Sequence, residues 1–207
     1  MVSSSLLALF VPTFFFVSAT PGMCMTLSMT LGMTVGVRRA LWMMLGELLG
    51  VGLIAVLAVI GVAAVMLNYP AAFTVFKWIG GVYLLYLGFQ MWLSKGKMAI
   101  PQDGHQPRET GARDLMVQGF LTAVANPKGW AFFISLLPPF ISADMPLIPQ
   151  LTILVTMILI IEFICLIIYA AGGRTLRHFL QKSGNVRIMN RIAGSLMMGV
   201  GIWLAFG

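Results

Sequence analysis

Two glutamates and one lysine stand out because each lies inside a long apolar stretch of the chain. Glu47 and Glu162 have no charged neighbours for many residues on either side, and Lys128 follows Asn126-Pro127 in a third such stretch. An acidic side chain at the centre of a membrane-crossing helix costs about 2.5–3.5 kcal/mol on insertion scales, so such residues usually face a bundle interior and serve an ion or substrate pathway. The alternatives are a neutral glutamic acid that bonds between helices, or a structural ion pair with Lys128.

The composition indicates that membrane helices carry these residues. Hydrophobic residues make up 59% of the chain, charged residues 9%, and the mean hydropathy is +0.96. Soluble domains are about 25% charged. The net charge of +7 lies mostly between the apolar stretches, which argues against a nucleic-acid partner.

Several stretches reach the roughly 20 apolar residues that cross a bilayer core of about 30 Å. They cover residues 4–34, 40–67, 71–93, 115–141, 147–171 and 189–206. A polar connector, 94–114, separates a first half, 1–93, from a second half, 115–207. Because no Lys or Arg precedes Arg38, the first stretch lacks the positive region of a signal peptide, and we expect it to be a retained span.

The basic residues of the connections alternate between the two sides of a six-helix arrangement. The first, third and fifth connections contain them, and the second and fourth, around 68–70 and 142–144, have none. They are Arg38, Arg39, Lys95, Lys97, Arg108, Arg113, Arg174, Arg177, Lys182, Arg187 and Arg191. The positive-inside rule therefore predicts cytoplasmic basic loops and both termini outside.

The two halves resemble each other. Ile79, Gly81 and Gly88 match Ile192, Gly194 and Gly201 at one constant offset. Glu47 in the second stretch also corresponds to Glu162 in the fifth, and Pro21 in the first to Pro127 in the fourth. A repeated unit of three spans must enter the membrane in opposite directions, so we expect an all-α membrane protein built from two inverted three-helix repeats, an architecture of secondary transporters.

Proline and glycine predict that the first and fourth helices are broken. Pro21-Gly22 and Asn126-Pro127 each lie near the middle of a stretch. Proline removes a backbone donor and glycine leaves the backbone unrestrained. Broken helices persist in hydrocarbon where they are buried or line a wet cavity, so these hinges indicate a substrate site; simple packing kinks are the alternative.

Several of these segments resemble the LysE/RhtB family of bacterial amino-acid exporters. The resemblance rests on Pro21-Gly22, Gly46-Glu47, the stretch from Lys77 to Gly88, Asn126-Pro127-Lys128, Tyr169-Ala170 and the ending from Asn190 to Leu204. It covers essentially the whole chain and implies export of amino acids, or close derivatives, driven by the proton gradient. The family pattern usually has proline and then a polar residue after Pro-Gly; Met23 and Cys24 stand there instead, which predicts a more apolar site.

The residues and the resemblance together predict an exporter of neutral or apolar amino acids in the bacterial inner membrane. Glu47 or Glu162 accepts the ammonium group, and the half-helix start near Asn126 and Lys128 accepts the carboxylate. The other glutamate carries the coupling proton. No enzymatic activity, cofactor or metal site is expected.

Further residues are candidates for lining the cavity: Met23, Cys24, Thr26 and Tyr169. Thr26 belongs to a stripe with Thr30 and Thr34 that could equally serve helix packing. A rival function is a membrane thiol–disulfide carrier that uses Cys24 and Cys165, and a passive channel is a further alternative. The glycine-rich third and sixth stretches could support a homodimer.

Overall fold

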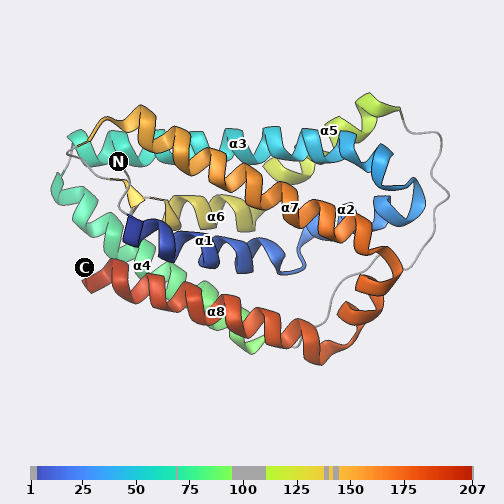
Figure 1. The fold of residues 1–207 in the computed structure, drawn as a ribbon. Coiled ribbons are helices and arrows are strands. Elements are labelled where there is room, and N and C mark those ends of the chain that lie inside the picture. The colour runs from blue at the N-terminus through green and yellow to red at the C-terminus, as the bar shows by residue number, and fades with distance from the viewer. Residues whose placement is uncertain (1–3, 69, 95–110, 138–139, 142–144, 207) are drawn as a thin grey trace.

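The computed structural model describes residues 4–68, 70–94, 111–137, 140–141 and 145–206, and every long element in these ranges is a helix (Figure 1). The helices are α1 (Ser4–Ala19), α2 (Met23–Thr34), α3 (Val37–Asn68), α4 (Pro70–Leu93), α5 (Ala112–Val124), α6 (Pro127–Leu136), α7 (Leu147–Gln181) and α8 (Ser183–Phe206). Most of the predicted connector, 95–110, and the basic residues Lys95, Lys97 and Arg108 within it lie outside the described residues.

Both predicted helix breaks fall at the expected residues. The helix α1 ends before Pro21-Gly22, and α2 restarts at an angle of 57°. The second break separates α5 from α6, where Asn126 is the N-cap of α6 and Pro127 its first residue. Proline is favoured at this position because the missing N–H has no helical partner there. Each break leaves a helix end inside the bundle.

A further bend lies in α7, which the sequence does not predict. Gly173 has φ 43° and ψ −123°, and this non-helical conformation turns the last part of α7 before α8 begins at Ser183. A positive φ of this kind strongly favours glycine. The predicted fifth stretch ends near this bend. The short helical segment after the bend contains Arg177 and ends before Lys182.

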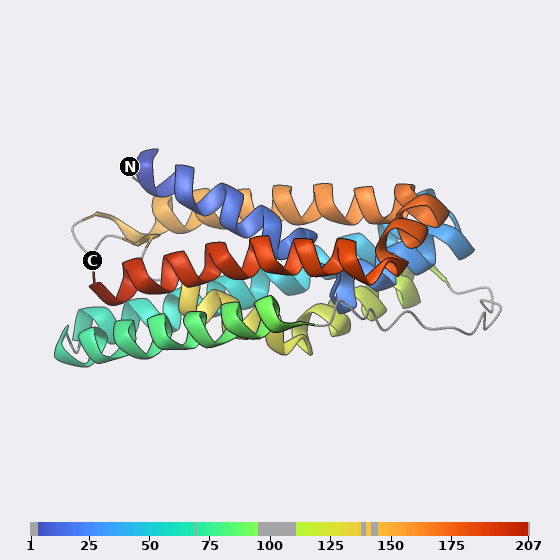
Figure 2. The ribbon, with the colours of Figure 1, turned by 90° about the horizontal axis from the view of Figure 1, so that it is seen from below.

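Glycines allow the helices to approach one another closely. A Cβ atom at Gly46 of α3 would overlap the carbonyl of Met116 in α5, and one at Gly32 of α2 would overlap the backbone of Ala170 in α7. The helices α4 and α8 lie side by side in Figures 1 and 2, and a Cβ at Gly194 would lie 2.5 Å from the carbonyl oxygen of Gly88. Small residues permit such packing in membranes.

Two segments of the described chain, Val37–Gly61 and Leu147–Gly173, are long and apolar enough to cross a membrane. The bent pair Phe10–Ala19 and Met23–Thr34 makes a third span if its two parts are counted together. The helices α5 and α6 are each short, and Trp78–Leu93 is an apolar helix below the length of this test. Figure 1 places both termini at one end of the bundle.

Candidate functional site

The two helix breaks, α3 and α7 meet at one internal cavity of about 60 Å³. Its polar lining consists of Ser18, Thr20, Cys24, Glu47, Asn126, Lys128 and Glu162. Its apolar lining includes Phe14, Val17, Met25, Val51, Ile54, Phe132 and Phe133. The four residues that the sequence predicts for substrate binding, Glu47 from the first half of the chain and Asn126, Lys128 and Glu162 from the second, therefore lie around the same space.

Glu47 is fully buried, with 0% of its surface exposed, and neither of its carboxyl oxygens has a hydrogen-bond partner. It lies on α3 beside the close contact with α5, where a Cβ at Gly119 would lie 2.9 Å from the Glu47 backbone nitrogen. An unpaired carboxylate is costly to bury, and either a bound proton or a bound ammonium group removes that cost. Glu47 is thus a ready acceptor for a cation.

Glu162 has a partner where Glu47 has none. The Ser18 hydroxyl in α1 donates to Glu162 Oε2 in α7 at 2.5 Å, within the buried interior. This bond connects α1 to α7. The two glutamates line one cavity in different hydrogen-bonding environments, so they are suited to different tasks.

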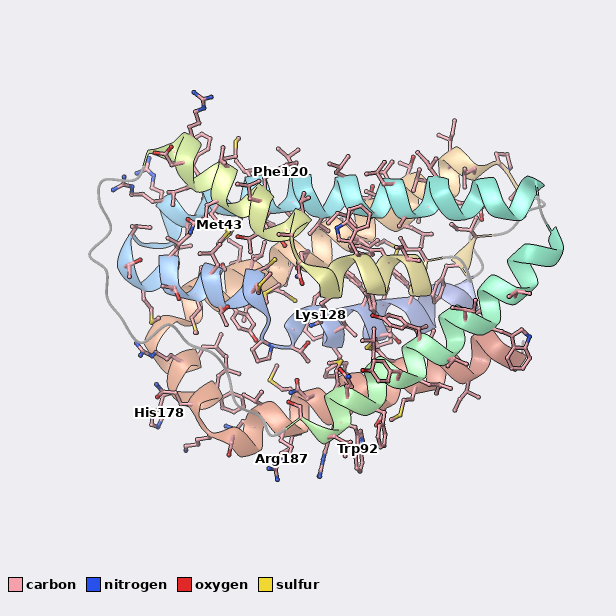
Figure 3. The ribbon with its side chains drawn as sticks, turned by 180° about the vertical axis from the view of Figure 1, so that it is seen from behind. Met43, Trp92, Phe120, Lys128, His178 and Arg187 are labelled. Atoms are coloured by element: carbon pink, nitrogen blue, oxygen red, sulfur yellow. The ribbon has the colours of Figure 1, made fainter. Side chains whose placement is uncertain are left out.

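Lys128 joins the two broken helices. Its ammonium group donates to the Val17 carbonyl at 3.0 Å and to Thr20 Oγ1 at 2.7 Å, at the C-terminal end of α1. A helix C-terminus carries a partial negative charge, which favours a cation there. These bonds go to α1 and not to Glu47 or Glu162. Figure 3 places Lys128 in the middle of the bundle.

The two helices that begin at the breaks, α2 and α6, differ in their N-terminal capping. The Asn126 side chain accepts from the Lys128 backbone N–H at 3.1 Å and so caps α6, whereas Gly22 gives α2 no side-chain cap. Asn126 Nδ2 also approaches Cys24 Sγ at 3.8 Å, across the two breaks. Exposed amides at a helix start favour an anion. The start of α2, with Gly22 and Cys24 in the cavity wall, leaves such amides available.

Known proteins decide the family. The sequence model of the LysE type translocators matches residues 15–207. The chain belongs to this family. A LysE-type translocator is a helical membrane transporter, and the resemblance seen in the sequence is confirmed. No solved structure matches the chain.

Relatives of this LysE-type translocator include proteins named for efflux. An uncharacterized membrane protein of Vibrio cholerae is 29% identical over 91% of this chain and 90% of its own. A homoserine/homoserine lactone efflux protein of Salmonella typhi is 29% identical over 75% of this chain and 74% of its own. A leucine efflux protein of Salmonella choleraesuis is 26% identical over 77% of this chain and 76% of its own.

Three of the predicted lining residues of the translocator lie outside the cavity wall. Met23 is 48% exposed, and the Thr26 hydroxyl donates to the carbonyls of Gly22 (2.8 Å) and Met23 (3.0 Å) in its own helix. The hydroxyls of Thr30 and Thr34 do likewise, four residues back, at 2.8 and 2.9 Å. Tyr169 is buried, and its hydroxyl donates to the Ala19 carbonyl at 2.7 Å. Tyr169 therefore donates a hydrogen bond to a carbonyl at the end of α1 and lies outside the cavity wall.

The hinge residues and the cysteines are placed as follows. Gly22 lines the cavity, Pro21 lines a neighbouring one, and Pro127 is the first residue of α6. Cys24 and Cys165 are both buried and free. Only Cys24 is part of the cavity wall. Nothing in this arrangement supports the thiol–disulfide carrier.

Sequence reasoning missed Ser18, Thr20 and the aromatic part of the wall. Ser18 and Thr20 are hydroxyl residues just before Pro21 in an apolar stretch, which is the signal that could have drawn attention to them. Phe14 packs against Phe132 and Phe133, with ring centroids 5.6 and 6.1 Å apart. These phenylalanines are ordinary residues of a membrane helix, so their sequence carries no comparable signal.

Proposed function

We propose that this protein exports neutral or apolar amino acids, or close derivatives, from the cytoplasm across the bacterial inner membrane, driven by the proton gradient. The observation that carries the proposal is Glu47, a buried carboxyl without a partner in a cavity where two helices are broken. Relatives named for homoserine and leucine efflux support an amino-acid substrate.

The proposal includes six membrane spans in two inverted three-helix repeats, with α1–α2 and α5–α6 each forming one broken span. Reciprocal glycine contacts support it, since the repeat exchanges Gly81 with Gly194 and Gly88 with Gly201. A Cβ at Gly88 would lie 2.6 Å from the Gly194 oxygen, and one at Gly201 would lie 2.7 Å from the Gly81 oxygen. The proposed symmetry therefore maps one contact onto the other. The first repeat covers 1–93, the cytoplasmic linker 94–114 and the second repeat 115–207, with both termini periplasmic.

A zwitterion fits the charges of the cavity. We assign the substrate ammonium to Glu47, because an ammonium group supplies the partner that its oxygens lack. Lys128 and the uncapped start of α2 then receive the carboxylate. Asn126 helps to hold Lys128 in position by capping α6. The side chain of the substrate meets Phe14 and the other apolar residues of the wall, which favours neutral, apolar amino acids.

We assign the coupling proton to Glu162. Glu162 on α7 already accepts a hydrogen bond from Ser18, whereas the oxygens of Glu47 on α3 accept none, so we give proton binding and ammonium binding to separate carboxyl groups. Intramembrane acids that bind protons are a regular part of proton-driven transporters.

The cavity as observed is too small for a substrate. Ligand pockets usually measure about 300–1,000 Å³, and this one measures about 60 Å³. It has room for a few water molecules but not for leucine. Export therefore needs a more open state, in which the helices around the breaks move apart, as alternating access requires.

Proteoliposomes loaded with radiolabelled leucine or homoserine test the proposal. We expect Glu47→Gln to abolish substrate binding and Glu162→Gln to abolish the dependence of export on the pH gradient while exchange of substrate persists. Asp114→Asn is the matched control, because Asp114 is an exposed acid at the start of α5. Wild-type rates for both glutamine variants would contradict the assignment, and full export after collapse of the gradient would contradict proton coupling.

A further inference from the structure

A second cavity of about 280 Å³ lies between the end of α1, the start of α6 and the pair α4–α8. It shares Val17, Thr20, Lys128 and Phe132 with the central cavity. The two spaces are therefore neighbours with a common wall. The second is the larger, and its volume approaches the lower end of ordinary ligand pockets, about 300 Å³.

Hydrogen bonds of the Lys128 side chain help to form the wall between the two cavities. The Lys128 ammonium bonds to Val17 and Thr20 across it, at 3.0 and 2.7 Å. A lysine side chain has several rotatable bonds and can exchange one acceptor for another. An anionic group that binds Lys128 can thus replace its bonds to Val17 and Thr20 at the point where the cavities meet.

The rest of the second cavity offers neutral polar groups. Gln90 and Ser94 of α4 and Asn190 of α8 contribute to its lining. The Asn190 amide donates to Ser94 Oγ at 3.0 Å, and the Gln90 amide donates to the Tyr86 hydroxyl. Among the lining residues that the structure describes, Lys128 is the one charged group. This combination suits a ligand whose carboxylate binds Lys128 and whose amino group is bonded by the side-chain oxygens of Gln90 and Asn190.

The second cavity lies toward the basic loops. Ser94 directly precedes the segment with Lys95 and Lys97, and Asn190 lies between Arg187 and Arg191. In the proposed orientation this is the cytoplasmic end of the bundle.

We propose that this second cavity is the cytoplasmic admission site for the amino acid. The inference rests on the proposed export function and adds the route of the substrate. The substrate enters with its carboxylate first. The carboxylate binds Lys128 from the cytoplasmic side, and Gln90 and Asn190 bond to the amino group. Lys128 then leaves Thr20, the wall opens, and the ammonium group reaches Glu47 in the central cavity.

Thiol labelling tests the route. In a Cys24→Ser, Cys165→Ser background, whose own export rate is the reference, Ser94→Cys and Asn190→Cys are treated with a charged, membrane-impermeant methanethiosulfonate. We expect labelling in inside-out vesicles, slowed by excess leucine or homoserine, and loss of export once the adduct fills the cavity. Ser183→Cys is the matched control, because Ser183 is exposed at the start of α8 and lies outside the cavity. It is expected to react without protection and without loss of export.

A second variant keeps the native cysteines. Asn190→Leu removes one neutral hydrogen-bonding group, and we expect KM for substrate at the cytoplasmic face to rise about fivefold with little change in kcat. KM at the outer face should not change. A structural defect alone would alter both faces.

The two failures are distinguishable. If the protein with its native cysteines exports no amino acid, the proposed function fails, and the ligand of the second cavity fails with it. If the reference protein exports but the fully labelled Ser94 and Asn190 variants export equally well, or amino acid gives them no protection, the admission site is overturned and the export function stands.

Discussion

Replacing Lys128 by methionine separates the binding role of its charge from its role in stability. The substitution keeps an unbranched stem as far as Cε and removes the ammonium group, which in the native protein donates at 3.0 Å to Val17 and at 2.7 Å to Thr20. Hydrogen bonds of charged groups contribute about 1.5–3 kcal/mol each. The desolvation of a buried charge costs several kcal/mol in the opposite direction. The two effects largely offset each other.

The carbonyl that Lys128 leaves is not orphaned. Val17 O also accepts from Thr20 Oγ1 at 2.5 Å and from the Thr20 backbone N–H at 3.3 Å. We therefore expect the free energy of unfolding of Lys128→Met to change by no more than about 1 kcal/mol, or about 2–4 °C in Tm for a chain of this size.

Transport should respond far more strongly. Loss of one charge-assisted contact with the substrate carboxylate, about 1.5–3 kcal/mol, lowers kcat/KM about 10- to 150-fold. Export from proteoliposomes and thermal unfolding in detergent measure the two quantities on the same preparation. Lys182→Met, at the exposed end of α7, is the matched control and should leave both unchanged. Export within twofold of the parent at unchanged Tm would refute the assigned role of Lys128.

Three further substitutions, one of them paired with a control in the same helix, test the packing and the site. Ser18→Ala leaves Glu162 without its donor, so we expect Tm in detergent to fall by about 3–12 °C; an unchanged Tm would mean that the bond contributes nothing. Gly46→Ala places a methyl group against backbone that cannot rotate away and should destabilise by at least about 1–3 kcal/mol. Gly61→Ala in the same helix, where nothing lies within 4 Å, should be neutral or stabilising by about 0.5–1 kcal/mol, and equal loss at both sites would contradict the packing argument. Phe14→Ala enlarges the cavity and should raise the export of phenylalanine relative to leucine; an unchanged ratio would show that Phe14 does not limit substrate size.

The helix breaks and the convergence of the charged residues could be predicted because their signals are local. A proline next to a glycine or asparagine changes the backbone at its own position, whatever the surroundings. An ionisable residue in an apolar stretch must face inward in any helical bundle, since lipid offers it no partner. Glu47, Glu162 and Lys128 obey this rule independently, and for that reason they meet.

The partners of these residues could not be predicted because they depend on contacts between distant parts of the chain. Ser18 reaches Glu162, and Lys128 reaches Thr20, across more than half the sequence. No periodicity within one helix encodes such pairs. The threonine stripe shows the opposite problem: its regular spacing indicates one helix face but does not say whether the hydroxyls bond outward or to their own helix.

The bond of Lys128 to α1 explains how substrate and conformational change could be linked. Lys128 belongs to the second half of the chain, and Val17 and Thr20 to the first, so this contact holds the two halves in the closed arrangement. A ligand shifts a conformational equilibrium only by its difference in affinity for the two states. In the proposed mechanism, a carboxylate that replaces Val17 and Thr20 as the partner of Lys128 binds more tightly once that contact has opened. In the proposed mechanism, substrate thereby stabilises the open state relative to the closed one, whereas the empty protein stays closed. The same contact then disfavours a leak of protons through Glu47 and Glu162 without substrate.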